Sequence, residues 1–246
     1  SSYLRDLGFN DGLEQLIDAV EKIDGVKTAR ILYLYPSTTT HNLIDKIADS
    51  KVFVNYFDMP LQHISQNMLK IMKRGKGAEK LIELMNYMRS KPNSFVRTTF
   101  IAGHPGESED DFEELCSFVE EFGFDRGNVF SYSDEEGTSA ETRDDKIEQE
   151  LVDERAEILG DIISQTTIKS LENDIGKSFE VYIDGESEEH EYLLSARKTI
   201  WAPQIDGEIY INDNEDNIPI IFGEIYEVEA TELAGDKLLA KIIRKV

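Results

Sequence analysis

The sequence predicts an α/β fold in which part of a (β/α) barrel with a parallel sheet is followed by a small antiparallel, OB-like β-barrel. In the first part, strand-like and helix-like segments alternate, which is typical of parallel βα units. A long charged helix follows at 147–172, and after it the chain shows only short strand patterns between turn signals. Short strands at regular spacing favour a small barrel. We therefore expect two domains, residues 1–175 and 176–246, with the boundary near Ile175–Lys177.

The helices of the first part are predicted from apolar side chains that recur on one helical face. The strands are predicted from β-branched and aromatic runs, two of which stop at Pro36 and Pro60. Ser108 is expected to cap the last of these helices, because Glu109 and Asp111 place acids in its first turn. The expected helices cover 13–23, 41–48, 68–73, 79–89 and 109–122, and the expected strands cover 30–35, 51–59, 95–101 and 128–133.

The second part begins with the long helix, whose apolar positions are Leu151, Ile158, Leu159 and Ile162. The turn signals that follow combine Gly with Asp or Asn, the residue types that adopt tight turns most readily. Between them lie five expected strands, at 178–183, 191–196, 207–212, 225–230 and 238–244.

Composition restricts the partners and the compartment. The net charge is -24, a surface that repels phosphate backbones and favours basic partners, although the acidity can equally serve only to keep the protein in solution. The single cysteine, Cys116, excludes a disulfide scaffold and favours a reducing compartment. It lies in a helical face beside Leu115 and Phe118, so we expect a core residue. With no leader-like or membrane-spanning apolar run, the expected location is cytoplasmic, away from the membrane.

Three segments with polar residues follow predicted strands, at Asp58–His63, Gly103–Glu107 and Ser131–Thr138. Ligands of βα folds bind where the strands end at their carboxyl side, so these segments predict one binding site. Each also has a simpler interpretation, as a tight Gly-Pro turn, a solvated acidic loop or an ordinary histidine. The four histidines are scattered, and no zinc spacing, phosphate loop or dinucleotide fingerprint is present.

Seven segments, in order along almost the whole chain, resemble the methylthiotransferases of the radical S-adenosylmethionine (SAM) superfamily. The resemblance implies the later part of a radical SAM barrel and, after it, a TRAM domain with an OB-like barrel. The segments are Tyr33–Pro36, Tyr56–His63, Leu69–Arg74, Arg97–Glu107, Phe124–Arg126, Tyr132–Thr138 and Ala202–Ile211.

The resemblance further implies an enzyme that holds two [4Fe–4S] clusters with two cysteine triads, binds SAM and takes electrons from a donor. The protein-modifying branch of the family, which this chain resembles, adds a methylthio group to the β-carbon of an aspartate in protein twelve of the small ribosomal subunit. This chain has only Cys116, and several thiolates are needed for one cluster. We therefore expect an inactive fragment whose full-length parent is the enzyme, and no metal bound by the fragment's own residues.

The resemblance also implies site residues, as a group at the SAM end of the barrel. No residue is assigned a proton-transfer role, since the chemistry of the family is radical. The expected SAM contacts are Gln62, His63, Arg97, Thr99, Gly103, Glu107, Tyr132 and Glu136.

One alternative is the related branch that methylthiolates an adenosine of tRNA. The segment Asp58–His63 looks like the protein-modifying branch, and residues 176–246 contain 16 acidic and 7 basic residues, a net charge of -9. A tRNA-binding barrel needs Lys and Arg instead, so direct binding of nucleic acid is not expected. The acidic barrel suits a basic loop of a ribosomal protein. A third interpretation is a non-catalytic module that binds RNA or protein.

The substrate contacts expected on the barrel are Glu186, Glu188, Glu189 and Trp201. Trp201 has two interpretations, an exposed anchor for the substrate or a residue of the barrel core.

Overall fold

A computed structural model describes residues 3–75, 77–214 and 217–246, and the chain divides into two compact units, Ser1–Thr166 and Thr167–Val246. The division falls inside a continuous helix, α6 (Gln149–Glu172). The boundary predicted near Ile175–Lys177 lies after the end of this helix and stays a prediction.

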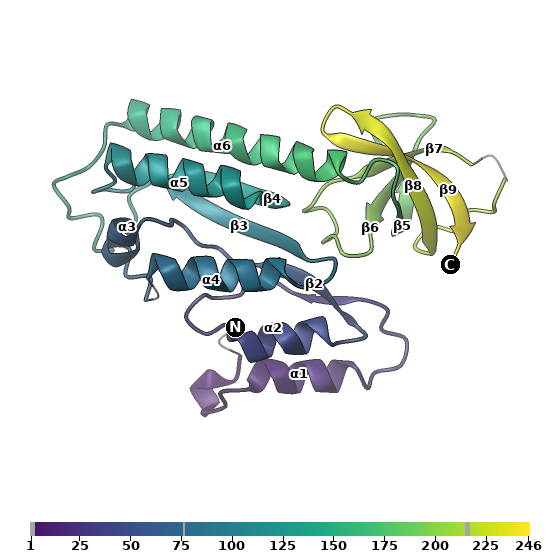
Figure 1. Ribbon diagram of the computed structural model, residues 1–246, viewed down its shortest axis with the longest axis horizontal. Coiled ribbons are helices and arrows are strands. Elements are labelled where there is room, and N and C mark those ends of the chain that lie inside the picture. Colours follow the sequence, from purple (N-terminus) through teal and green to yellow (C-terminus); the bar gives the residue numbers. More distant parts are fainter. Residues whose placement is uncertain (1–2, 76, 215–216) are drawn as a thin grey trace. The chain divides into compact units, whose positions relative to one another are not determined.

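The first unit contains one parallel sheet with the strand order β1-β2-β3-β4 (Figure 1). Its strands are β1 (Ala29–Ile31), β2 (Phe53–Asp58), β3 (Phe95–Ala102) and β4 (Arg126–Ser131). β1 ends earlier than predicted because Tyr33 adopts a left-handed backbone with φ of 60°. The chain continues beside β2 without regular pairing, and Leu34 N–H donates to the Asp58 carbonyl at 2.7 Å.

Helices connect the strands, in line with the predicted alternation. Side chains cap three of them at the N-terminus, Thr40, Ser65 and Ser108, and the last forms the expected cap with Asp111 at the third helical position. None of the described helices combines the length and apolar composition needed to cross a membrane. Before α6 the helices are η1 (Arg5–Leu7), α1 (Gly12–Val20), α2 (His41–Ala48), α3 (Gln66–Ile71), α4 (Ala78–Arg89) and α5 (Glu109–Phe122).

The two faces of β3 have different roles. Val96, Thr98 and Phe100 are fully buried, and the two apolar side chains belong to the core that the helices form with the sheet. The alternate residues Arg97 and Thr99 are only half-buried and point to the other face. Because side chains of a strand alternate between faces, one strand supplies both core and site.

The core-facing stripe of α6 differs from the predicted one. Leu159 is buried as expected, but Leu151 and Ile158 are exposed, and Val152 and Ile163 are buried instead. Arg155, 4% exposed, lies on the same stripe. Because Arg155 occupies a core-facing position, a prediction from apolar residues alone misplaces the buried face of this helix.

The second unit is a closed five-stranded barrel with the order β5-β6-β7-β9-β8. All neighbouring pairs are antiparallel except β7 and β9, which are parallel, so the predicted small antiparallel, OB-like barrel is confirmed with one parallel pair in it. Along the chain β8 follows β7, but in the barrel β9 lies between the two. Strand β9 is antiparallel to β8 and runs in the same direction as β7. The strands are β5 (Ser178–Glu186), β6 (Leu194–Lys198), β7 (Ile209–Asp213), β8 (Ile225–Ala234) and β9 (Lys237–Lys245).

Candidate functional site

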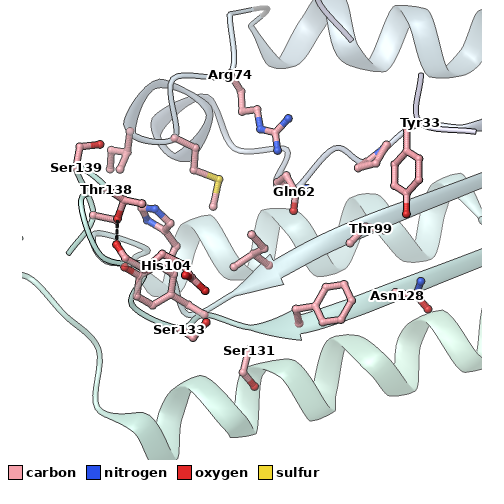
Figure 2. Close-up of a pocket in the computed structure, with 18 of the residues that line it drawn as sticks. Tyr33, Gln62, Arg74, Thr99, His104, Asn128, Ser131, Ser133, Thr138 and Ser139 are labelled. Atoms are coloured by element: carbon pink, nitrogen blue, oxygen red, sulfur yellow. Dashed lines mark hydrogen bonds between the residues drawn. The ribbon is translucent and has the colours of Figure 1, made fainter. Parts of the chain in front are cut away.

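A pocket of about 720 Å³ lies where the sheet strands end at their carboxyl side (Figure 2). The helix-free face of β3 and β4 supplies Thr99, Ile101, Asn128 and Phe130, and the loops that follow the strands supply most of the other side chains. Four of the residues expected to contact SAM line this pocket: Gln62, Arg97, Thr99 and Tyr132. The pattern of polar residues after strands therefore located the pocket.

Gln62 is held at the pocket by its backbone. Its φ is 71°, its N–H donates to the Thr99 carbonyl at 2.8 Å, and its own carbonyl accepts from Ile101 N–H at 2.9 Å. The side-chain oxygen is buried and has no hydrogen-bond partner among the described residues. A buried amide oxygen without a donor costs free energy, so this atom is ready to accept a hydrogen bond from a ligand.

Arg97 lies against the buried carboxylate of Asp58, with 3.4 Å between Nη1 and Oδ1. Asp58 also accepts from the Tyr33 backbone N–H at 3.2 Å. With its amide oriented to satisfy its neighbours, Asn128 accepts from Arg97 Nη2 at 2.8 Å. Burial raises the pKa of Asp58, although the Tyr33 hydrogen bond and the charge of Arg97 both oppose this rise. The positive charge of Arg97 is thus largely balanced by the protein itself.

Three other predicted contacts, His63, Gly103 and Glu107, form a buried cluster and do not line the pocket. The Glu107 side chain is fully buried and accepts from Gly103 N–H at 3.2 and 3.1 Å. His63 Nδ1 accepts from Ser65 N–H at 3.0 Å, so Nε2 carries the proton and faces Glu107 Oε2 at 3.5 Å. These three residues thus lie in a supporting position next to the pocket, and their direct contact with SAM stays a prediction.

Helix α6 approaches the backbone of Gly103 so closely that a side chain would not fit there. A Cβ at this glycine, whose φ is +78°, would lie 2.6 Å from both methyl carbons of Val152. Arg155, one turn further along α6, donates to Glu107 Oε1 at 2.8 Å and to Glu109 at 2.9 Å. Sequence reasoning missed Arg155, because a charged residue in a long charged helix resembles a solvated one.

The loop after β4 brings in Tyr132 but not Glu136. Tyr132 N–H donates to the Ala102 carbonyl at 2.9 Å, and its ring lies edge-on to His104 with 5.0 Å between centroids. Burial, and then the hydrogen bond to Asp134, raise the pKa of Tyr132 to about 12. Glu136 is exposed and absent from the pocket lining, in which Glu135 takes part instead. The SAM contact of Glu136 therefore stays a prediction, and the acidic residue of this loop that lines the pocket is its neighbour Glu135.

His104 and Arg74 also line the pocket and were not predicted. His104 Nδ1 donates to the Pro105 carbonyl at 2.9 Å, and burial lowers the pKa of this imidazole, which favours the neutral form with a free acceptor at Nε2. Arg74 lies over the Tyr35 ring at 5.6 Å, and it has no carboxylate partner among the described residues. Figure 2 shows Arg74 reaching the pocket on the side of Gln62. In the sequence, Arg74 was indicated only as the last residue of Leu69–Arg74, one of the seven segments that carry the family resemblance.

The barrel carries its own hollow of about 740 Å³. Its acidic lining includes Glu186, Glu188 and Glu189, and its basic member is Arg197. Glu189 is paired to Lys237 at 2.5 Å, and this hydrogen bond lowers the pKa of the carboxyl. The structure thus brings the three predicted glutamates together, two of them without an ion pair among the described residues.

Trp201 is only 2% exposed and lies in the barrel core. Its ring lies below the Lys198 ammonium group, at 5.6 Å from the centroid. The exposed-anchor interpretation is therefore wrong for this conformation, and the core interpretation is correct, because a large aromatic ring gains most from burial.

The residues of this chain do not fit an iron–sulfur cluster. Cys116 is half-buried against the core of the first unit, and burial raises the pKa of its thiol to about 11. A cluster needs thiolates, and a thiol with a raised pKa is a poor source of one. Among the described residues there is also no group of three His, Cys, Asp or Glu side chains placed to hold a metal ion.

Comparison with known proteins agrees with this architecture. Residues 7–119 match the radical SAM superfamily, and residues 175–243 match the TRAM domain. The chain is 77% identical over 246 residues to the ribosomal protein uS12 methylthiotransferase RimO of Aliarcobacter butzleri, across 99% of this chain and 55% of the relative. This chain belongs to the RimO family of radical SAM proteins.

Two further relatives carry the same name. Identity is 59% over 245 residues with the protein of a Sulfurovum species, and 58% over 243 residues with that of a Nitratiruptor species. These alignments cover 100% and 98% of this chain, and 55% of each relative. The chain therefore spans about half the length of the curated relatives that it matches.

Proposed function

We propose that this chain is the SAM-binding part and the TRAM domain of an enzyme that methylthiolates an aspartate of a small-subunit ribosomal protein. The observation that carries the proposal is the 77% identity across 99% of the chain to a relative named as a ribosomal protein uS12 methylthiotransferase. The part of the protein outside this chain would supply the cysteines for two [4Fe–4S] clusters, and the chain alone would be inactive. Its single thiol favours a reducing cytoplasmic location.

The pocket residues fit SAM in kind. Arg74, without a carboxylate partner among the described residues, would bind the carboxylate of the amino-acid part. The orphaned Gln62 oxygen and the Thr99 hydroxyl would bind polar atoms of the nucleoside part. Bound to a reduced cluster, SAM supplies the radical chemistry that activates a carbon–hydrogen bond. The residues of this chain would orient the cofactor for that step, and the buried cluster of His63, Gly103 and Glu107 would hold the pocket wall in place.

The proposal is tested with the full-length protein, reconstituted anaerobically with iron and sulfide and supplied with SAM and a reductant. We expect a mass gain of one methylthio group on the ribosomal protein and none on tRNA offered beside it. Arg74→Gln is expected to weaken SAM binding roughly 10- to 100-fold, the range for a lost charge-assisted hydrogen bond. Arg126→Gln, at the opposite end of β4, serves as the control.

Other outcomes separate the alternatives. A mass gain on tRNA would show the tRNA-modifying branch, which the names of the relatives do not favour. SAM binding without transfer to either substrate would contradict the enzyme and favour a binding module.

The barrel hollow is proposed to contact the basic loop of the substrate protein. Glu186 and Glu188 are exposed at the hollow, and opposite charges across an interface accelerate encounter. The double change Glu186→Lys and Glu188→Lys is expected to lower kcat/KM for the ribosomal protein about tenfold at low salt, with less effect at high salt. Glu232→Lys with Asp236→Lys, two exposed acids outside the hollow, is the matched control. Equal rates for both double variants would contradict a role of the hollow.

A further inference from the structure

A small basic surface lies beside the pocket, in a chain whose net charge is -24. It is a hollow of about 320 Å³ between α3 and α4, and the charged residues in the described part of its lining are Lys70, Lys73 and Arg74. None of these three cations has a carboxylate partner among the described residues. Many other cations of the chain do, such as Lys91 with Asp45 and Arg89 with Asp125. We call Lys70, Lys73 and Arg74 the basic rim.

The backbone holds the basic rim in a defined turn. Lys73 adopts a left-handed φ of 55°, and Arg74 N–H closes the end of α3 by donating to the Leu69 carbonyl at 2.8 Å. Gln66 Oε1 accepts from Ala78 N–H at 3.0 Å, which ties the start of α3 to the start of α4. A lysine in a left-handed backbone is uncommon, and here it presents its charge next to that of Arg74.

The position of the basic rim indicates which part of a substrate it would contact. Arg74 lines both this hollow and the pocket, so the exposed Lys70 and Lys73 stand at the pocket's edge, where a macromolecular substrate would approach. A basic protein loop would be repelled by this edge, whereas phosphate groups would be attracted.

We propose that Lys70 and Lys73 bind backbone phosphates of ribosomal RNA next to the modified protein. This inference rests on the proposed function, because it takes the substrate to be a protein in its ribosomal setting. The overall charge still predicts no general affinity for nucleic acid. The contact would be local, would offset repulsion between the acidic enzyme and the RNA, and would be sensitive to salt.

The test compares two substrates of the full-length, reconstituted enzyme: intact small ribosomal subunits and the isolated ribosomal protein. Lys70→Glu with Lys73→Glu is expected to lower kcat/KM on subunits on the order of tenfold and to cause no loss on the isolated protein. The slope of log(kcat/KM) against log[salt] on subunits is expected to change by about 1 to 2, as for two lost phosphate contacts. Lys22→Glu with Lys27→Glu, two exposed lysines outside the basic rim, carries the same charge change as the control.

An equal loss on both substrates, or no loss on either, would overturn the inference. A second measurement does not depend on activity: the fluorescence anisotropy of a labelled single-stranded oligouridylate mixed with each variant. Weaker binding by the rim variant alone supports a phosphate site, and equal binding by all proteins overturns it. If the wild type modifies neither substrate, the proposed function fails, and the anisotropy still decides whether the basic rim binds RNA.

Discussion

Replacing Arg155 with methionine is expected to lower the free energy of unfolding of the first unit by about 3–5 kcal/mol, the range for a buried ion pair that loses one partner. Arg155 and Glu107 have side chains only 5% and 0% exposed, and their atoms Nη1 and Oε1 lie 2.8 Å apart. Without the guanidinium, the Glu107 carboxylate still accepts from the single Gly103 N–H and faces His63, but it has no cation beside it. The uncompensated charge in a buried site is the cause of the loss.

The measurement is urea denaturation followed by far-ultraviolet circular dichroism, which reports mainly the helices of the first unit. Trp201, the single tryptophan, lies in the second unit, so its fluorescence is an internal reference that should not change. Lys46→Met, which removes one partner of the exposed pair with Asp18, is the control and is expected to cost about 0–1 kcal/mol. A similar loss of stability for both variants would contradict the role of Arg155 as the buried ion-pair partner of Glu107.

A double variant sharpens this prediction. Glu107→Gln together with Arg155→Met removes both charges, so the pair should be less destabilised than the sum of the single variants by about 0.5–3 kcal/mol. Simple additivity would show that the two side chains do not interact in solution.

Gly103→Ala is expected to destabilise the first unit by about 2–5 kcal/mol, from strain in a left-handed backbone and from overpacking. The new Cβ would lie 2.6 Å from both methyl carbons of Val152, so either α6 or the loop after β3 must move. Because Gly103 N–H also donates to Glu107, the movement should weaken SAM binding by the full-length protein as well. Urea denaturation and a SAM titration measure the two effects.

Two further variants separate strain from overpacking. Gly137 has φ of +79° and open space where a Cβ would be, so Gly137→Ala should show only the backbone strain, about 1–2 kcal/mol. Adding Val152→Ala to Gly103→Ala removes the clash and should restore part of the stability. Equal costs at the two glycines would mean that the contact with Val152 has no energetic weight.

The location of the pocket could be predicted, because in a parallel sheet all strands end at one edge, and polar residues after successive strands must meet there. Gln62 and Tyr132 were found in this way, whereas Thr99 lies within β3 and was expected only from the family resemblance. His104 could have been found from the same rule, since it directly follows β3 and Gly103. Arg74 could not, because it follows a helix and reaches the pocket only through the turn at Lys73.

The sequence by itself determined the order of strands and helices, the cap at Ser108, the change from α/β to barrel, and the family. These depend on local propensity, on short-range periodicity and on joined motifs, all of which are present in the chain as written. Only the tertiary structure decided which polar residues face the pocket and which lie beneath it. Glu107 and Arg155 are 48 residues apart in the sequence. The Glu107 carboxylate forms a buried ion pair beneath the pocket only because the distant helix α6 packs over it and supplies Arg155. The same reason applies to Trp201, since closure of the barrel, and not the residue's own chemistry, buries its ring.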